Sequence, residues 1–198
     1  MMRSFFRFVL IAGVLCLQAV AARADSQLFM ATAFVPTVSG TTMSAYKVTG
    51  GSAQLLNDVL FDFGTLLYDG QNQVWYAPSY FYITVAAVQG VSPNVTVSYK
   101  EGANPNGNQN HALGAKVVLT FTRLTATGQQ NLMASHPSQA LKDIGLVTVT
   151  PAELGGDSLD IALGIYRGFP VVAGAEPFTN ADTPGAYTGT LTVTSTVQ

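Results

Sequence analysis

Cysteine is almost absent from this chain. The single cysteine, Cys16, lies in an apolar segment near the start, so an intramolecular disulfide is excluded. Small exported domains that lack a sufficient core usually depend on disulfides for stability. This chain must instead be held together by its core, and a hydrophobic content of 48% over 198 residues is enough for one domain of that kind.

Charge is also scarce, since Asp, Glu, Lys and Arg together make up only 10% of the residues. Of the nine Lys and Arg residues, Arg3, Arg7 and Arg23 lie in the first 24 positions, whereas all eleven acidic residues follow them. From residue 25 onward, six basic side chains face eleven acidic ones. A basic surface for nucleic acid is therefore not expected.

The residue patterns of catalytic sites are missing as well. His111 and His136 are the only histidines, and neither has the spacing of a zinc site. Ser135 precedes His136, but adjacent residues seldom meet as nucleophile and base, and no G-x-S-x-G motif occurs. The Asp-Phe-Gly triplet at 62–64 is found in protein kinases, but the other kinase motifs are absent. We predict that the chain is not an enzyme and holds no cofactor and no metal.

One acidic cluster leaves a question about calcium. Glu153, Asp157 and Asp160 lie in and beside a glycine-containing turn, where three carboxylates could gather around a hard cation. A solvated turn explains the same residues without an ion. Whether Asp157 and Asp160 bind calcium stays open from the sequence.

The first 24 residues have the pattern of a secretory signal peptide. Two arginines precede an apolar run from Phe8 to Val20, and Ala22 and Ala24 provide a small-x-small cleavage signal. The apolar run is shorter than the roughly 20 residues that span a bilayer. We expect cleavage after Ala24, secretion to the extracellular space or cell surface, a single domain over 25–198, and no membrane span in the mature chain.

Alternating apolar and polar residues predict several antiparallel strands after the signal. Buried rows are expected at Phe81, Ile83 and Val85, then at Val117, Leu119 and Phe121, with Lys116 on the outward face, and on one parity of residues 187–197. Residues 94–99 are expected to form a hairpin with 80–88, and 127–143 to form a short helix or an irregular crossover. Further strands are expected at 41–48, 59–63, 144–151 and 158–167.

These strands and the irregular turn spacing define the expected fold class. It is all-β, an antiparallel β-sandwich of immunoglobulin-like or jelly-roll type. A closed antiparallel barrel is the alternative.

The segment 28–35, "LFMATAFV", differs from the other expected strands because both of its faces are apolar. Such a strand is buried on both sides or lies in a groove. We single out five of its residues as a candidate assembly strand: Leu28, Phe29, Met30, Phe34 and Val35.

Aromatic residues gather in the segment 74–82, "VWYAPSYFY". Trp75, Tyr80 and Tyr82 combine a flat apolar face with a polar atom, which is what sugar-binding surfaces use. They are the candidate ligand aromatics, although packing against a loop or a neighbouring subunit is the simpler explanation.

Three segments resemble a known family. "FVP" at 34–36, "FDFGTL" at 61–66 and "TPGAYTGTLTVT" at 183–194 are similar to the secreted β-sandwich subunits of the spore-coat-protein-U and fimbrial, pilin-like type. The resemblance implies a structural subunit that assembles with copies of itself, as a homopolymer, or with related surface subunits.

The residues separately favour the same function. An exposed sheet edge can pair with another chain, and an extended segment such as 28–35 can be added to that edge as a donor strand. The first hypothesis is a subunit of an extracellular fibre, pilus or coat assembled by β-strand addition. The alternative is a secreted carbohydrate-binding or adhesin module that binds glycans.

Overall fold

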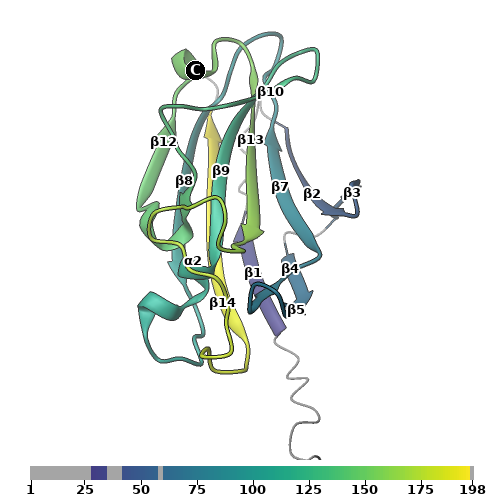
Figure 1. The fold of residues 1–198 in the computed structure, drawn as a ribbon. Coiled ribbons are helices and arrows are strands. Elements are labelled where there is room, and N and C mark those ends of the chain that lie inside the picture. Colours follow the sequence, from purple (N-terminus) through teal and green to yellow (C-terminus); the bar gives the residue numbers. More distant parts are fainter. Residues whose placement is uncertain (1–27, 35–41, 58–59, 197–198) are drawn as a thin grey trace, which may run out of the picture.

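The structure, a computed structural model, describes residues 28–34, 42–57 and 60–196. The expected signal peptide (1–24) and Val35 lie outside the described residues. The fold is a mostly antiparallel β-sandwich whose two main sheets are not joined into a closed cylinder, which confirms the predicted all-β sandwich (Figure 1).

Sheet A has five strands in the order β12-β8-β14-β1-β4. Its strands are β12 (Leu146–Val149), β8 (Asn94–Glu101), β14 (Tyr187–Thr196), β1 (Leu28–Phe34) and β4 (Leu60–Thr65). All pairs in this sheet are antiparallel except the pair of β1 with β14.

Sheet B has seven strands, in the order β10-β9-β13-β7-β2-β3 with β11 also beside β9. They are β10 (Gln130–Leu132), β9 (Val117–Leu124), β13 (Ser158–Ile165), β7 (Ser79–Val85), β2 (Met43–Thr49), β3 (Ser52–Leu55) and β11 (Gln139–Ala140). A separate hairpin joins β5 (Leu67–Asp69) to β6 (Val74–Tyr76).

Among the described residues the helical segments are short. They are α2 (Leu113–Lys116), α3 (Pro151–Leu154) and the 3-10 turns η1 (Gln109–His111) and η2 (Leu141–Asp143). None of the helices in the described parts of the chain has the length and apolar character that crossing a bilayer requires.

The core lies between the two sheets and is built from the predicted alternating rows. The rows of β7 and β9 are buried as expected, and in β14 the odd-numbered residues from Tyr187 to Ser195 are buried while the threonines between them are not. Phe81 of β7 stacks on Phe61 of β4 with ring centroids 5.0 Å apart, and it meets the edge of Phe63 at 4.9 Å. These contacts join sheet B to sheet A.

One expectation about local structure is wrong, and a second is met only in part. Residues 80–88 and 94–99 do not form a hairpin, because β7 pairs with β2 and β13 in sheet B whereas β8 pairs with β12 and β14 in sheet A. The connection between them passes from one sheet to the other. The segment 127–143 contributes β10 and β11, two short edge strands beside β9, and η2.

Candidate functional site

The backbone of β1 lies inside sheet A, between β14 and β4. It pairs in parallel with β14 from Phe29 to Phe34 and antiparallel with β4 from Leu28 to Thr32. Figure 1 shows β1, in purple, beside the yellow β14. We call the position between β14 and β4 the β1 slot. Each wall of the slot is the edge of a strand, and the backbone of β1 pairs with the main-chain N–H and C=O groups of both edges.

The register decides which residues of β1 are level with the core. Phe29, Ala31 and Ala33 are level with Tyr187, Gly189 and Leu191, which form the buried row of β14. Met30 and Phe34 are level with Thr188 and Thr192 of the other row. Residues opposite one another on paired strands share a face of the sheet. Along β14, the parity of β1 that matches the core row is therefore that of Phe29, Ala31 and Ala33, and not that of Met30 and Phe34. Against β4 the register shifts between Phe29 and Met30, and Ala31 is opposite the buried Phe61.

Below the slot the core is tightly packed. Phe61 and Phe63 of β4 and Leu191 of β14 are each at most 2% exposed. A Cβ added to Gly189 would overlap the ring of Tyr99 on β8, so glycine is needed at this position. The core side of the slot is thus apolar, with no spare volume beside Gly189.

The candidate ligand aromatics occupy two parts of the molecule. Trp75 lies in β6, where its indole Nε1 donates a hydrogen bond to Asn180 Oδ1 at 3.0 Å and its ring contacts Tyr68. Tyr80 and Tyr82 lie in β7 beside a separate cavity of about 230 Å³. Tyr82 stacks on Tyr46 with the ring centroids 4.7 Å apart. Tyr80 and Tyr82 share a face, and Trp75 does not line their cavity.

His136 contacts a carboxylate in the structure. Its Nε2 lies 3.1 Å from Glu153 Oε1, and Ser135 also hydrogen-bonds to Glu153. The same carboxylate accepts hydrogen bonds from the Thr150 backbone amide and hydroxyl. The Glu153 backbone amide in turn donates to Thr150 Oγ1 at 3.4 Å, and the two backbone donations form the capping box that starts α3. Ser135 and His136 therefore both contact the Glu153 carboxylate of the helix cap. With the Thr150 amide and hydroxyl, four donor groups surround this carboxylate.

The capping box predicts a pH-dependent contribution to stability. The Thr150 backbone amide, together with the Thr150 and Ser135 hydroxyls and His136, lowers the pKa of Glu153 to about 2. The folded state thus favours the carboxylate, and its contribution is present above the ordinary glutamate pKa and is lost as the pH falls toward 2. We expect Glu153→Gln to lower the free energy of unfolding by about 1 kcal/mol at pH 7, and by less at pH 3, in urea titrations.

Thr150→Val is the control for this prediction, because it removes the hydroxyl and keeps the backbone donor. Its stability should therefore still decline with acid, somewhat less steeply than that of the unchanged protein, because the backbone amide that lowers the pKa of Glu153 most is kept. A Glu153→Gln deficit that is equal at pH 7 and pH 3 would contradict the assignment.

The three carboxylates considered for calcium have separate partners. Asp157 pairs with Arg123 at 3.6 Å. Asp160 is 2% exposed and accepts hydrogen bonds from Thr84 Oγ1 at 2.5 Å and Gln130 Nε2 at 2.9 Å. Glu153 belongs to the capping box. The structure does not bring these three residues together.

A cluster of four ionisable side chains was not anticipated as a group from the sequence. Lys116, expected on the outward face of its strand, lies at the end of α2 and is 2% exposed. Its Nζ is 2.6 Å from Glu176 Oε1 and 2.8 Å from Asp182 Oδ1. His111 Nδ1 is 2.7 Å from Glu176 Oε1. The structure thus corrects the expected orientation of Lys116.

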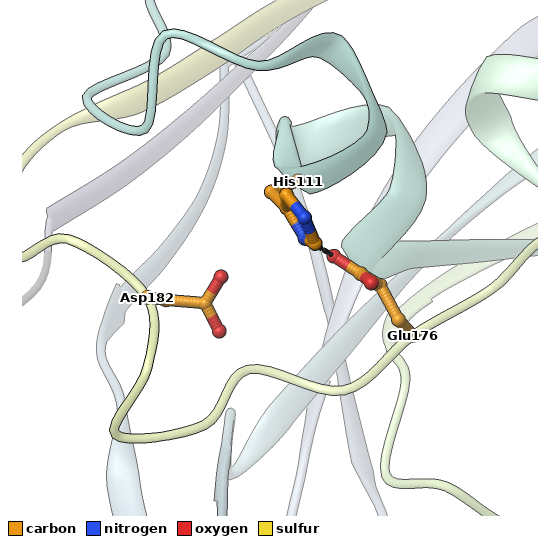
Figure 2. A group of neighbouring side chains, drawn as sticks. All are labelled: His111, Glu176 and Asp182. Carbon is orange, nitrogen blue, oxygen red and sulfur yellow. Dashed lines mark hydrogen bonds and ion pairs between the residues drawn. The ribbon is translucent and has the colours of Figure 1, made fainter.

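The ligand atoms of His111, Glu176 and Asp182 lie within 4.8 Å of one another, as in a metal site. Figure 2 shows the His111–Glu176 pair with the Asp182 carboxylate facing it from a separate stretch of the same connection. The Lys116 ammonium contacts both carboxylates. A cation of the protein itself therefore takes the position where a metal would have to bind, and the cluster does not fit a metal site.

The fold and the β1 slot define a class, namely a β-sandwich whose first sheet is completed by its N-terminal described strand. Comparisons with protein-family models, with curated proteins and with solved structures gave no match.

Proposed function

We propose that the chain is a structural subunit of an extracellular fibre, pilus or coat, in which β1 of one copy completes sheet A of another. The observation that carries the proposal is the place of β1 as an interior strand, paired with β14 on one side and with β4 on the other. All other described elements follow β1 in the chain. One connection, residues 35–41, therefore joins it to them.

Exchange of β1 between copies of the chain favours assembly into a polymer. The β1 of a second copy can supply the same main-chain hydrogen bonds and the same apolar residues as the chain's own strand. Each copy then both donates a strand and accepts one. A contact between two different surfaces that does not close on itself generates a filament.

Composition and resemblance agree with this proposal. The pattern of residues 1–24 favours export. Phe34 and Val35 of the "FVP" segment, and residues 61–66 and 183–194, carry the resemblance to spore-coat-protein-U and fimbrial subunits. The segments 61–66 and 183–194 contain most of β4 and the first part of β14, which are the two walls of the slot. The proposal includes a location outside the cell or on its surface, and it assigns no enzymatic activity.

The proposal predicts that strands pass between chains. Thr32 and Thr190 are level with each other, so each can be replaced by cysteine in a different copy of the chain. When Thr32→Cys and Thr190→Cys proteins are mixed and oxidised, a disulfide between the two chains is expected, and negative-stain microscopy should show fibres. Cys16 lies in the expected signal peptide, so the introduced cysteines have no native competitor in the mature chain.

Thr148→Cys provides the control, since Thr148 is an exposed residue of the outer strand β12. Mixed with Thr32→Cys, it should give little disulfide between chains. A wild-type protein that stays monomeric at high concentration, or equal cross-linking with both partners, would contradict the proposal.

A further inference from the structure

The cluster around Lys116 has the composition of a site for covalent bond formation. A primary amine lies within hydrogen-bond distance of two carboxylates, 2.6 Å from Glu176 and 2.8 Å from Asp182. The amine and the Asp182 side chain are nearly withdrawn from water, with side-chain exposures of 2% and 5%. The Lys116 ammonium also lies 5.1 Å from the centre of the Phe178 ring, an apolar neighbour.

We propose that Lys116 and Asp182 condense to an intramolecular amide, with Glu176 as the catalytic carboxylate. The bond would tie the end of α2, directly before β9, to the connection that precedes β14. This inference does not depend on the proposed function, because the cluster belongs to a single chain and lies outside the β1 slot.

The two carboxylates differ in ways that assign their roles. Asp182 is the more buried, and its Oδ2 accepts a hydrogen bond from the Thr179 backbone amide at 2.7 Å. Asn106 Nδ2 approaches Oδ1 at 3.3 Å. These donors hold the carboxyl group still and can stabilise negative charge that develops on it during attack. Asp182 is therefore the acceptor.

Glu176 is better suited to carry protons. Its side chain is 33% exposed, and its Oε1 contacts both Lys116 Nζ and His111 Nδ1. Glu176 and Asp182 also have ligand oxygens within 4.8 Å of each other, so a proton taken from Nζ has a short path to the oxygen that leaves.

The reaction balances without an added reagent. Lys116 Nζ passes one proton through Glu176 to one Asp182 oxygen, and the resulting neutral amine attacks Cγ of the protonated carboxyl group, which forms the N–C bond. A second proton from Nζ then moves through Glu176 to the same Asp182 oxygen. The C–O bond to that oxygen breaks, and it leaves as water. Glu176 ends as a carboxylate, and the amide keeps one N–H.

Proximity and burial favour the condensation. Groups held in contact reach effective concentrations on the order of 10⁵–10⁸ M. Amide formation also replaces two desolvated charges, which are costly to bury, by a neutral group. A cavity of about 520 Å³ that is lined by Lys116, Glu176 and Asp182 offers the released water a way out.

Tryptic mapping of the purified full-length protein tests the inference. An acylated Lys116 resists trypsin, so peptide 101–123 should stay uncut at Lys116 and be joined to peptide 168–198. The joined mass should be one water below the sum of the two peptides, and fragmentation should place the link on Asp182. Separate peptides 101–116, 117–123 and 168–198 would show a plain ion pair and overturn the proposal.

Two variants separate the roles of the residues. Glu176→Gln should stay folded by circular dichroism and give unlinked peptides, since the proton acceptor is missing. In Asp182→Asn, any link that forms should release ammonia in place of water. A fragment spectrum that places the link on Glu176, or full linkage in the Glu176→Gln protein, would overturn the assignment of acceptor and catalyst.

Discussion

A chain shortened to begin after Phe34 is expected to lose its folded state. Without β1, the facing edges of β14 and β4 have no partner in the middle of sheet A. The buried side chains of Phe61, Phe63 and Leu191 also lose the strand that completes their sheet. The loss is expected to be comparable with the whole free energy of unfolding, on the order of 5–15 kcal/mol. Circular dichroism should show little strand signal and no cooperative unfolding.

A synthetic peptide of residues 28–34 should restore the fold of the shortened chain. The register supplies a matched pair of controls. Ala31 is level with the buried Gly189 and Phe61, whereas Thr32 is level with the exposed Thr190 and Leu60. A peptide with Ala31→Asp would place a charge at core level, at a cost of several kcal/mol, and should not rescue folding. The Thr32→Asp peptide should rescue it. Equal rescue by both peptides, or a shortened chain that folds alone, would refute this account of the slot.

Replacing Lys116 with methionine is expected to destabilise the protein by about 3–5 kcal/mol, since removing one partner of a buried ion pair leaves charge uncompensated. Asp182 is 5% exposed and would face Glu176 without the ammonium between them. If the amide to Asp182 forms, the variant also loses a cross-link over residues 116–182, worth about 4 kcal/mol by loop-closure entropy. Urea unfolding at pH 7 measures the loss.

Two further variants serve as controls for the Lys116→Met prediction. Lys100 is an exposed residue of β8, and Lys100→Met should change the free energy of unfolding by no more than about 0.5 kcal/mol. The triple variant Lys116→Met, Glu176→Gln, Asp182→Asn removes all three charges and should recover a large part of the electrostatic loss. A Lys116→Met protein as stable as the Lys100→Met protein would show that the cluster contributes nothing to stability.

Strand positions were the most predictable feature of the fold. The rows at Phe81, Ile83 and Val85 and at Leu191 and Val193 are buried in the structure as the alternation predicted. This works because the face on which a strand residue lies depends only on its parity along the strand, which is a local property. Burial of one face then follows from the hydrophobic effect.

Pairing between strands was less predictable. Residues 80–88 and 94–99 are close in sequence but belong to different sheets. The alternation of apolar and polar residues along a strand is the same whichever strand it pairs with. The partner is therefore decided by the strand edges and sheet faces that remain available in the assembled sandwich. The same argument applies to β10 and β11, which pair with β9. Their sequences are short and show no alternation of apolar and polar residues from which a strand could be predicted.

The sequence by itself determined that this chain is a cysteine-poor β-sandwich and that residues 28–35 suit a strand apolar on both faces. Only the tertiary structure decided that β1 lies between β14 and β4, with Phe29 level with the core row. Likewise, Lys116 looked like an outward residue of a strand, and its burial depends on Glu176 and Asp182, which are more than 50 positions away. A charged side chain can be buried only where folding brings opposite charges to it, and those partners lie beyond the reach of any local pattern.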